Sequence, residues 1–426
     1  MAPSESSINL KHNQHLSLLV LTSSFPNSPA DETCGYIRDF ARALSTEFKV
    51  TVLAPAGHNT LRWPNDLFTL QRSRSFLPAA LDPFQAGDDL NRLTEANFFA
   101  LFATLLSLGC FFYRAVSLAL KVDVVCSHWM FPCGFIGSLI CRLLRKPHVV
   151  VEHSGAIHLL SKIRGGKTIA QFVVKRSTQI VVVSKHLKRK LIGVCPEATD
   201  VTAVIPMGID LPFPHCVQID EPAREAGQVW PSTILFIGRL TRIKGLDVLL
   251  SALKSLNDVR LVVAGDGECR DELEQLARKL SVNAAFLGRI NASQRQHLLS
   301  LCDAVVIPSR ILSDGRTEGT PVVFMEAIAA GRVVIASNVG GLAEIIVDNH
   351  NGLLFEPEDY AALRERIRAV LQDRHLRQRI EGEARRMSAD FSWERIGSQY
   401  GRIIKKALKK NGIVGHRRIE VSDVRN

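Results

Sequence analysis

Short runs of valine, isoleucine and leucine recur along the chain, and they restrict the possible fold more than any other feature. Examples are LSLLVLTSSF at 16–25, HVVVEHS at 148–154 and RVVIASN at 332–338, each separated from the next by a stretch of helical character. Near-continuous apolar runs are typical of strands buried on both faces, whereas half-exposed strands alternate apolar and polar residues. The sequence therefore predicts parallel sheets whose strands are joined by crossover helices.

The predicted strands form two successive groups. They are 16–25, 49–55, 122–128, 148–154 and 179–184 in the first group, and 232–240, 259–267, 283–288, 302–309 and 332–338 in the second. A chain of 426 residues is too long for one ordinary core, so two domains of about 200 residues each are expected. We predict two tandem, doubly wound, Rossmann-like α/β domains.

The domain boundaries follow from the two groups. Residues 1–210 form the first domain, 211–231 a linker rich in proline, glycine and charge, and 232–390 the second domain. Residues 391–426 form a C-terminal helix, expected to pack back on the first domain, and a tail. Ligands of open parallel sheets bind beyond the carboxyl ends of the strands, so a cleft between the two sheets is the expected binding site.

The net charge of +11 is concentrated in one segment. From Arg114 to Lys190 the chain has fourteen lysines and arginines but only two acidic residues. Such a segment attracts anions, which include nucleic acid, anionic lipid headgroups and phosphorylated substrates; a solvated basic face is the simpler interpretation of any single residue. Nucleic-acid binding is disfavoured because the segment lacks aromatic residues interleaved with its basic ones, and because it would leave Glu318 and Glu326 unexplained.

The cysteines and the apolar stretches indicate the cellular compartment of the protein and its relation to a membrane. Nine cysteines show neither a C-x-x-C pair nor metal-ligand spacing, which predicts reduced thiols and no metal site. The apolar run at 16–21 is too short for a signal peptide, so we expect a cytoplasmic protein. A longer apolar stretch, 97–113, is interrupted by Thr104, Ser107 and Gly109. It predicts a buried or membrane-surface helix in preference to a membrane span.

The stretch EGTPVVFMEAIAAG, residues 318–331, contains one unexpected charge. Thr320 is suited to the N-cap and Pro321 to the first position of a helix that ends at Gly331. Apart from Glu326 this helix is apolar all round and should be buried, and a buried carboxylate needs a partner. Two partners are considered: the vicinal hydroxyls of a nucleotide's ribose, or an arginine in a salt bridge.

Two further stretches of the second half suit an anionic ligand. In GRLTRIKG, Arg239 and Lys244 precede a helix N-terminus, where two cations and free backbone amides would bind a diphosphate; a solvated turn is the alternative. In DGRTEGTP, Glu318 and the backbone amides of Gly319 and Thr320 suit a sugar or a phosphate.

Other candidate residues lie where the cleft is expected. Gly340 and Gly341 occupy a turn into a helix, where backbone amides can approach a phosphate closely. Arg289 follows a predicted strand and lies near the expected pocket for the base. In the first domain, Gly35 belongs to the loop after the first strand, and His153 ends a strand at the carboxyl edge of the sheet.

Together these motifs resemble the retaining nucleotide-sugar glycosyltransferases of family 4, which have the two-domain architecture called GT-B. The resemblance extends from about Leu16 to Tyr400. Its most specific motif is E-x7-E, formed here by Glu318 and Glu326, and SHWMFPCG, VIPMGID, GRLTRIKG and NVGGLAEI match in order and spacing.

The resemblance implies a role for each candidate residue. Glu326 would bind the ribose of the donor, and Arg239 and Lys244 would neutralise the departing diphosphate. Glu318, with the loop that continues through Pro321, would hold the donor sugar. His153 would lie near the anomeric carbon.

The resemblance also implies the reaction. Family members retain the anomeric configuration by a route in which the leaving phosphate accepts the proton of the acceptor, so neither a metal nor a further cofactor is expected. The donor would be a UDP- or GDP-linked sugar. The acceptor would be a glycan or lipid-linked molecule of surface polysaccharide or glycolipid synthesis, with an anionic membrane surface as a further partner. A nucleotide-sugar epimerase or hydrolase of the same architecture is the alternative.

Overall fold

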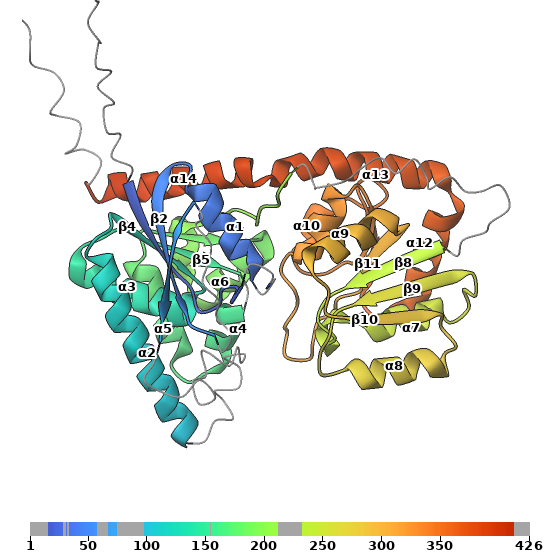
Figure 1. Cartoon of the computed structure of the whole chain (residues 1–426), viewed down its shortest axis with the longest axis horizontal. Coiled ribbons are helices and arrows are strands. Elements are labelled where there is room, and N and C mark those ends of the chain that lie inside the picture. Colours follow the sequence, from blue (N-terminus) through green and yellow to red (C-terminus); the bar gives the residue numbers. More distant parts are fainter. Residues whose placement is uncertain are drawn as a thin grey trace, which may run out of the picture.

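The computed structural model describes residues 16–28, 31, 34–57, 67–74, 98–153, 155–211 and 232–412. Within this part the chain forms two parallel sheets, one in each half (Figure 1). The first has the strand order β3-β2-β1-β4-β5-β6-β7 and the second β10-β9-β8-β11-β12-β13. In each sheet the order reverses beside the first strand of that half, which is where α/β sheets bind ligands. The predicted fold of two doubly wound, Rossmann-like domains is therefore confirmed.

Each sheet is built from strands of three to eight residues. The strands of the first sheet are β1 (Leu16–Leu21), β2 (Phe48–Pro55), β3 (Thr69–Ser73), β4 (Val124–His128), β5 (His148–Glu152), β6 (Gln179–Val182) and β7 (Thr202–Val204). Those of the second sheet are β8 (Ser232–Ile237), β9 (Val259–Ala264), β10 (Ala284–Gly288), β11 (Ala304–Ile307), β12 (Val333–Ser337) and β13 (Leu353–Phe355).

The helices cover both faces of each sheet. The first half contains α1 (Gly35–Leu44), α2 (Phe98–Ala119), α3 (Phe135–Leu144), α4 (Gly155–Lys162), α5 (Gly166–Arg176) and α6 (Lys185–Val194). The second half contains α7 (Leu246–Leu253), α8 (Arg270–Lys279), α9 (Ala292–Leu301), α10 (Val322–Ala329), α11 (Leu342–Ile345), α12 (Tyr360–Gln372), α13 (Arg374–Ser388) and α14 (Trp393–Lys410). Apolar clusters on the two faces of each sheet form its core.

All ten predicted strands overlap an observed one, and three observed strands were not predicted. The unpredicted strands are β3, β7 and β13, which all lie at sheet edges. Residues 69–73 read TLQRS, and only the last is buried. An edge strand of this kind has neither the length nor the apolar composition of a central strand, so its sequence carries little signal.

The last helix of the chain completes the core of the first domain. Trp393, Tyr400 and Ile404 of α14 are buried in the same cluster as Phe40 of α1. The Tyr400 hydroxyl donates a hydrogen bond to the carbonyl of Ile205 at 3.2 Å. Figure 1 shows α13 and α14 running in succession along the second and then the first domain. The predicted linker, 211–231, lies outside the described residues except for residue 211.

The apolar stretch 97–113 falls largely within α2; residue 97 lies outside the described residues. Phe111, Ala115 and Ala119 are buried against the first sheet. By length and composition α2 is the one helix of the described residues that could cross a membrane, with 33% of its apolar window buried. One face of α2 therefore packs on the first sheet, and Thr104 and Ser107 of the same helix are buried as well.

We predict that Tyr400→Ala destabilises the first domain, because it leaves a large cavity between α1 and α14. The expected loss is about 3–5 kcal/mol, the range for large aromatic residues replaced by alanine. Urea denaturation measures this loss. Lys406→Ala, on the exposed face of the same helix, is the control and should change stability by less than about 0.5 kcal/mol. Equal effects of the two substitutions would contradict the packing role of Tyr400.

Candidate active site

A cation and a carboxylate meet at the carboxyl ends of two neighbouring strands in the second domain. Lys244, in a short 3-10 turn after β8, forms an ion pair with Glu318 in the loop after β11. The Ser309 hydroxyl donates a hydrogen bond to the other oxygen of Glu318 at 2.7 Å. Both charged side chains are largely buried, with exposed fractions of 18% and 16%. The predicted need of Lys244 for an anion is met here by Glu318.

Three threonine hydroxyls lie in the loops beside this ion pair. The hydroxyls of Thr241, Thr317 and Thr320 are buried and have no hydrogen-bond partner among the described residues. Buried hydroxyls normally have a partner, since an unpaired one costs about 1–3 kcal/mol. Their clustering indicates a site that a polar ligand would complete. The sequence analysis named only Thr320; the other two lie inside its quoted motifs and could have been found there.

The glycine pair predicted to approach a phosphate instead packs against the Glu318 loop. A Cβ on Gly340, which has φ +57°, would lie 2.0 Å from the Glu318 carbonyl oxygen. The Gly341 amide donates a hydrogen bond to the Gly319 carbonyl at 3.1 Å. The prediction of a free amide is therefore wrong for Gly341, because this amide joins two loops of the protein.

Glu326 has a protein partner. Its carboxylate lies 3.0 Å from the Arg295 guanidinium of α9, and the two side chains have exposed fractions of 11% and 19%. The argument that this acid needs a ribose to satisfy it is therefore wrong, and the salt-bridge alternative is correct for this structure. Residue spacing along α10 could not identify a cation supplied by a separate helix. A role for Glu326 in ribose binding now rests on the family motif alone.

The start of α10 also differs from the prediction. The helix begins at Val322 with Pro321 at the N-cap, one residue later than expected, and ends at Ala329. Thr320 consequently makes no capping hydrogen bond. Proline has no amide hydrogen and fits the fixed backbone angle before a first turn, so it can occupy this position. Thr320 is thereby left in the loop with Glu318 and Gly319.

Two histidines stack at the carboxyl edge of the first sheet. His153 Nε2 lies 2.8 Å from His128 Nδ1, and the rings are nearly parallel with centroids 5.1 Å apart. The Tyr36 ring lies 5.0 Å from that of His153. Burial lowers the pKa of His153 to about 3. It also lowers the pKa of His128 well below its usual value, with a smaller contribution from His153. Both rings are therefore neutral at pH 7, and His153 can hydrogen-bond a ligand but does not carry charge.

Gly35 begins α1, directly after Cys34 at the N-cap. Burial raises the pKa of the Cys34 thiol, and among the smaller opposing effects is the positive charge of Arg239. Because Arg239 belongs to the second domain, its charge acts across the space between the two sheets. The loop after β1 and the loop after β8 thus face each other, as the sequence predicted. Arg289 is exposed after the edge strand β10 and makes none of the contacts described for the other candidates.

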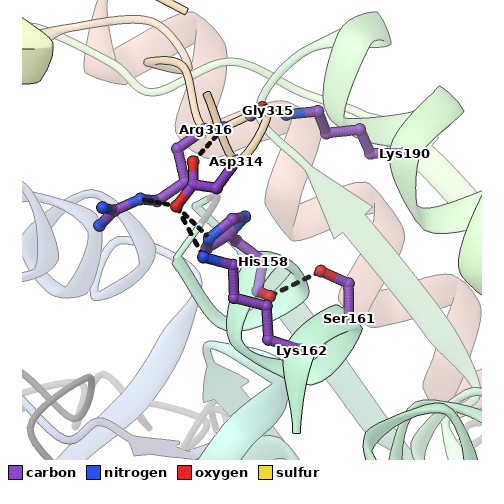
Figure 2. A network of polar contacts seen from close by, with 7 residues as sticks. All are labelled: His158, Ser161, Lys162, Lys190, Asp314, Gly315 and Arg316. Atoms are coloured by element: carbon purple, nitrogen blue, oxygen red, sulfur yellow. Dashed lines mark hydrogen bonds and ion pairs between the residues drawn. The ribbon is translucent and has the colours of Figure 1, made fainter. Parts of the chain in front are cut away.

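Polar contacts join the loop that carries Glu318 to the first domain (Figure 2). Asp314, four residues before Glu318, accepts a hydrogen bond from Lys162 at 2.6 Å and lies 3.5 Å from His158 Nε2. Lys190 donates to the Gly315 carbonyl at 2.9 Å. Helices α4 and α6 of the first domain therefore hold the loop that carries Glu318.

A second contact lies beside the glycine pair. Glu344 of α11 accepts hydrogen bonds from the Lys185 amide at 2.7 Å and from Arg189 at 2.9 Å. Lys162 and Lys190 also contact the second domain, so several residues of the basic segment lie at the contact between the domains. The sequence interpretation of that segment as a site for external anions is therefore incomplete: part of its charge holds the two domains together.

Two family models match successive parts of the chain. The model described as Glycosyltransferase Family 4 matches residues 35–213, and Glycosyl transferases group 1 matches residues 221–387. An uncharacterized glycosyltransferase of Methanocaldococcus jannaschii is 31% identical over 310 residues, which cover 68% of this chain and 77% of that relative.

A second relative and a solved structure are more specifically described. The relative is a Campylobacter jejuni GalNAc-alpha-(1->4)-GalNAc-alpha-(1->3)-diNAcBac-PP-undecaprenol alpha-1,4-N-acetyl-D-galactosaminyltransferase, 29% identical over 199 residues, or 44% of this chain and 52% of that relative. The structure is Anabaena HepE in complex with UDP-glucose, with a TM-score of 0.68, 19% identity and coverage of 92% and 100% of the two chains. The latter shows that the fold is GT-B. The chain is a glycosyltransferase and belongs to glycosyltransferase family 4.

Proposed function

We propose that the protein transfers a hexose from a UDP- or GDP-linked donor to an acceptor with retention of anomeric configuration. The observation that carries this proposal is the group of paired charges and unpartnered buried hydroxyls at the ends of β8 and β11. A nucleotide sugar offers a diphosphate for the cations and sugar hydroxyls for the acid and the threonines. The complex of HepE with UDP-glucose, a protein of the same fold, supports this donor class.

Lys244 and Arg239 are proposed to act on the leaving diphosphate. In the structure Lys244 is paired with Glu318. A diphosphate entering the site would compete for Lys244, and Glu318 would then be available to accept hydrogen bonds from the donor sugar. Stabilising the charge that develops on the leaving group in a closed site contributes several kcal/mol, comparable to about 3–4 kcal/mol for an oxyanion-hole donor. Neither step needs a metal ion.

The remaining candidates are proposed to position the donor. The amides of Gly319 and Thr320 would contact the sugar, and Glu326 would contact the ribose while Arg295 fixes its orientation. Gly340 supports the Glu318 loop by close packing. Neutral His153 would donate or accept a hydrogen bond near the anomeric carbon. Because burial lowers the pKa of its ring to about 3, His153 is a weak base, and the leaving phosphate is the better acceptor for the proton of the incoming hydroxyl.

The acceptor is proposed to be a lipid-linked or membrane-proximal glycan on the cytoplasmic side of the membrane. The exposed apolar face of α2 supports a membrane-proximal site. The undecaprenol-linked substrate in the name of the Campylobacter jejuni relative is consistent with this class of acceptor. The eight described cysteines are free thiols, which suits a reducing compartment.

A panel of nucleotides and nucleotide sugars tests the donor. The true donor should stabilise the protein in thermal-shift assays, because ligand at a hundredfold its Kd adds about 2.7 kcal/mol to stability. Transfer from this donor to a simple lipid-linked sugar should give a product whose anomeric proton coupling, measured by NMR, matches that of the donor. Inverted configuration would refute retention. Conversion of the donor to its epimer without an acceptor would favour the epimerase alternative.

Lys244→Ala and Arg239→Ala should each reduce turnover at least about tenfold, equivalent to ~1.4 kcal/mol of transition-state stabilisation. The reason is the loss of one positive charge opposite the leaving diphosphate. Arg242→Ala is the control, since Arg242 lies in the same turn as Lys244 but is exposed. Steady-state kinetics and a melting curve of each variant separate a catalytic effect from unfolding. If either variant turned over as fast as Arg242→Ala, the proposed role of that residue in stabilising the leaving diphosphate would be ruled out.

Asp314→Asn should loosen the contact between the domains. The hydrogen bond from Lys162 lowers the pKa of Asp314, so this contact is fully present above the ordinary pKa of aspartate and is lost as pH falls through the lowered one. At pH 7 we expect an increased radius of gyration by small-angle scattering. The donor KM should rise about two- to fivefold, as expected for a partly exposed ion pair. Asp200→Asn, at an exposed site, should change neither quantity.

A further inference from the structure

A hollow of about 520 Å³ lies between β3 and the middle of α2. Its lining includes Arg72, Arg74 and Arg114 on one side and Leu105, Gly109 and Tyr113 on the other. Ligand pockets usually measure roughly 300–1,000 Å³. None of the residues assigned above to the donor or to the reaction lines this hollow.

The polar side of the hollow is strongly positive. Three arginines line it, and no acidic residue is among the lining residues that the structure describes. Arg74 is exposed and Arg114 donates one hydrogen bond to the Gln71 side chain. Arg72 is anchored by a hydrogen bond to the Pro55 carbonyl at 2.9 Å, while its Nε is buried without a partner among the described residues. None of the three forms an ion pair with a carboxylate of the described residues, although the charge of Asp31 acts on Arg72. Guanidinium groups in this state are suited to a phosphate group.

The other side of the hollow is apolar and continues along α2. Phe102, Leu105 and Tyr113 have exposed fractions of 56%, 59% and 77%. With Gly109 they are spaced by three or four residues, so they share one face of the helix. The opposite face packs on the sheet. Figure 1 shows the N-terminal end of α2 extending beyond the strands of the first sheet.

The hollow lies at the same edge of the sheet as the candidate active site. Ser73 is the last residue of β3, and Arg72 also donates a hydrogen bond to the carbonyl of Pro26 in the loop after β1. That same loop leads to Cys34, which experiences the charge of Arg239 across the space between the domains. A ligand in the hollow would therefore have its polar end directed toward the acceptor side of the cleft.

We infer that this hollow binds the phosphate-bearing end of the acceptor lipid, with the exposed face of α2 inserted among the hydrocarbon chains of the membrane. Charge complementarity favours this occupant: the arginines match a lipid phosphate, and the adjoining apolar face matches its hydrocarbon. A soluble phosphorylated sugar would use the arginines but not the apolar face. The inference rests on the proposed lipid-linked acceptor and adds the site that selects it.

Gly109→Leu provides a direct test, because a Cβ at Gly109 has no neighbouring atom within 4 Å and the new side chain would project into the open hollow. Leucine also has a higher helix propensity than glycine, so the melting temperature should not fall. Gly382→Leu is the matched control: Gly382 also lies inside a helix, α13, with open space at its Cβ. Arg74→Glu tests the charge independently.

Binding is measured by cosedimentation with phosphatidylcholine vesicles with and without phosphatidic acid. The unaltered protein and Gly382→Leu should bind the phosphatidic acid vesicles at least tenfold more tightly than phosphatidylcholine alone. Gly109→Leu and Arg74→Glu should each bind the phosphatidic acid vesicles at least fivefold more weakly than the unaltered protein. Unchanged binding by Gly109→Leu, or equal binding to both kinds of vesicle, would overturn the inference. Displacement by soluble glycerol phosphate at a similar concentration would show a site for soluble phosphates instead.

The same variants separate this inference from the proposed function. Vesicle binding requires neither donor nor turnover, and thermal shifts with the donor should be the same in Gly109→Leu and the unaltered protein. Transferase activity on lipid-linked acceptors without vesicle binding through the hollow would reject the site and keep the function. Vesicle binding through the hollow without any transferase activity would support the binding site and reject the proposed function.

Discussion

The burial of parallel strands on both faces is the constraint on which the rest of the structure depends. Strands such as β5 and β12 have no exposed residue, so their sheets must be covered by helices on both sides. Polar and flexible residues are then confined to the ends of the strands. In both domains the residues considered for chemistry lie in loops at the carboxyl ends, and these loops meet because the two sheets face each other.

Electrostatic pairing organises these loops before any ligand is bound. Glu318 is held by Lys244 and Ser309, Glu326 by Arg295, and Asp314 by Lys162 of the other domain. The first two pairs keep charged groups oriented in a largely buried setting, where an unpaired charge would be costly, whereas the Asp314 pair is partly exposed. Under the proposed function, an entering diphosphate would compete with Glu318 for Lys244. Donor binding and contact between the domains would then be coupled through the loop that carries Asp314 and Glu318.

The first domain has two distinct surfaces around its sheet. Helix α14 covers one region completely and places Tyr400 in the core. Helix α2 covers another region with one face only, leaving aromatic and aliphatic side chains exposed beside arginines. An exposed apolar patch of this kind normally marks an interaction site. Its position at the carboxyl edge of the first sheet is the reason for relating it to the proposed acceptor.

The sequence by itself determined the fold class and the central strands, because valine- and isoleucine-rich runs have few alternatives to burial in a parallel sheet. It also located Lys244, Glu318 and His153, since residues at strand ends meet at one edge of a sheet. Only the tertiary structure decided which charges pair. Arg295 reaches Glu326 from another helix, and Lys162 reaches Asp314 from another domain. Such contacts depend on the distance between elements remote in the chain, and local residue spacing contains no measure of that distance.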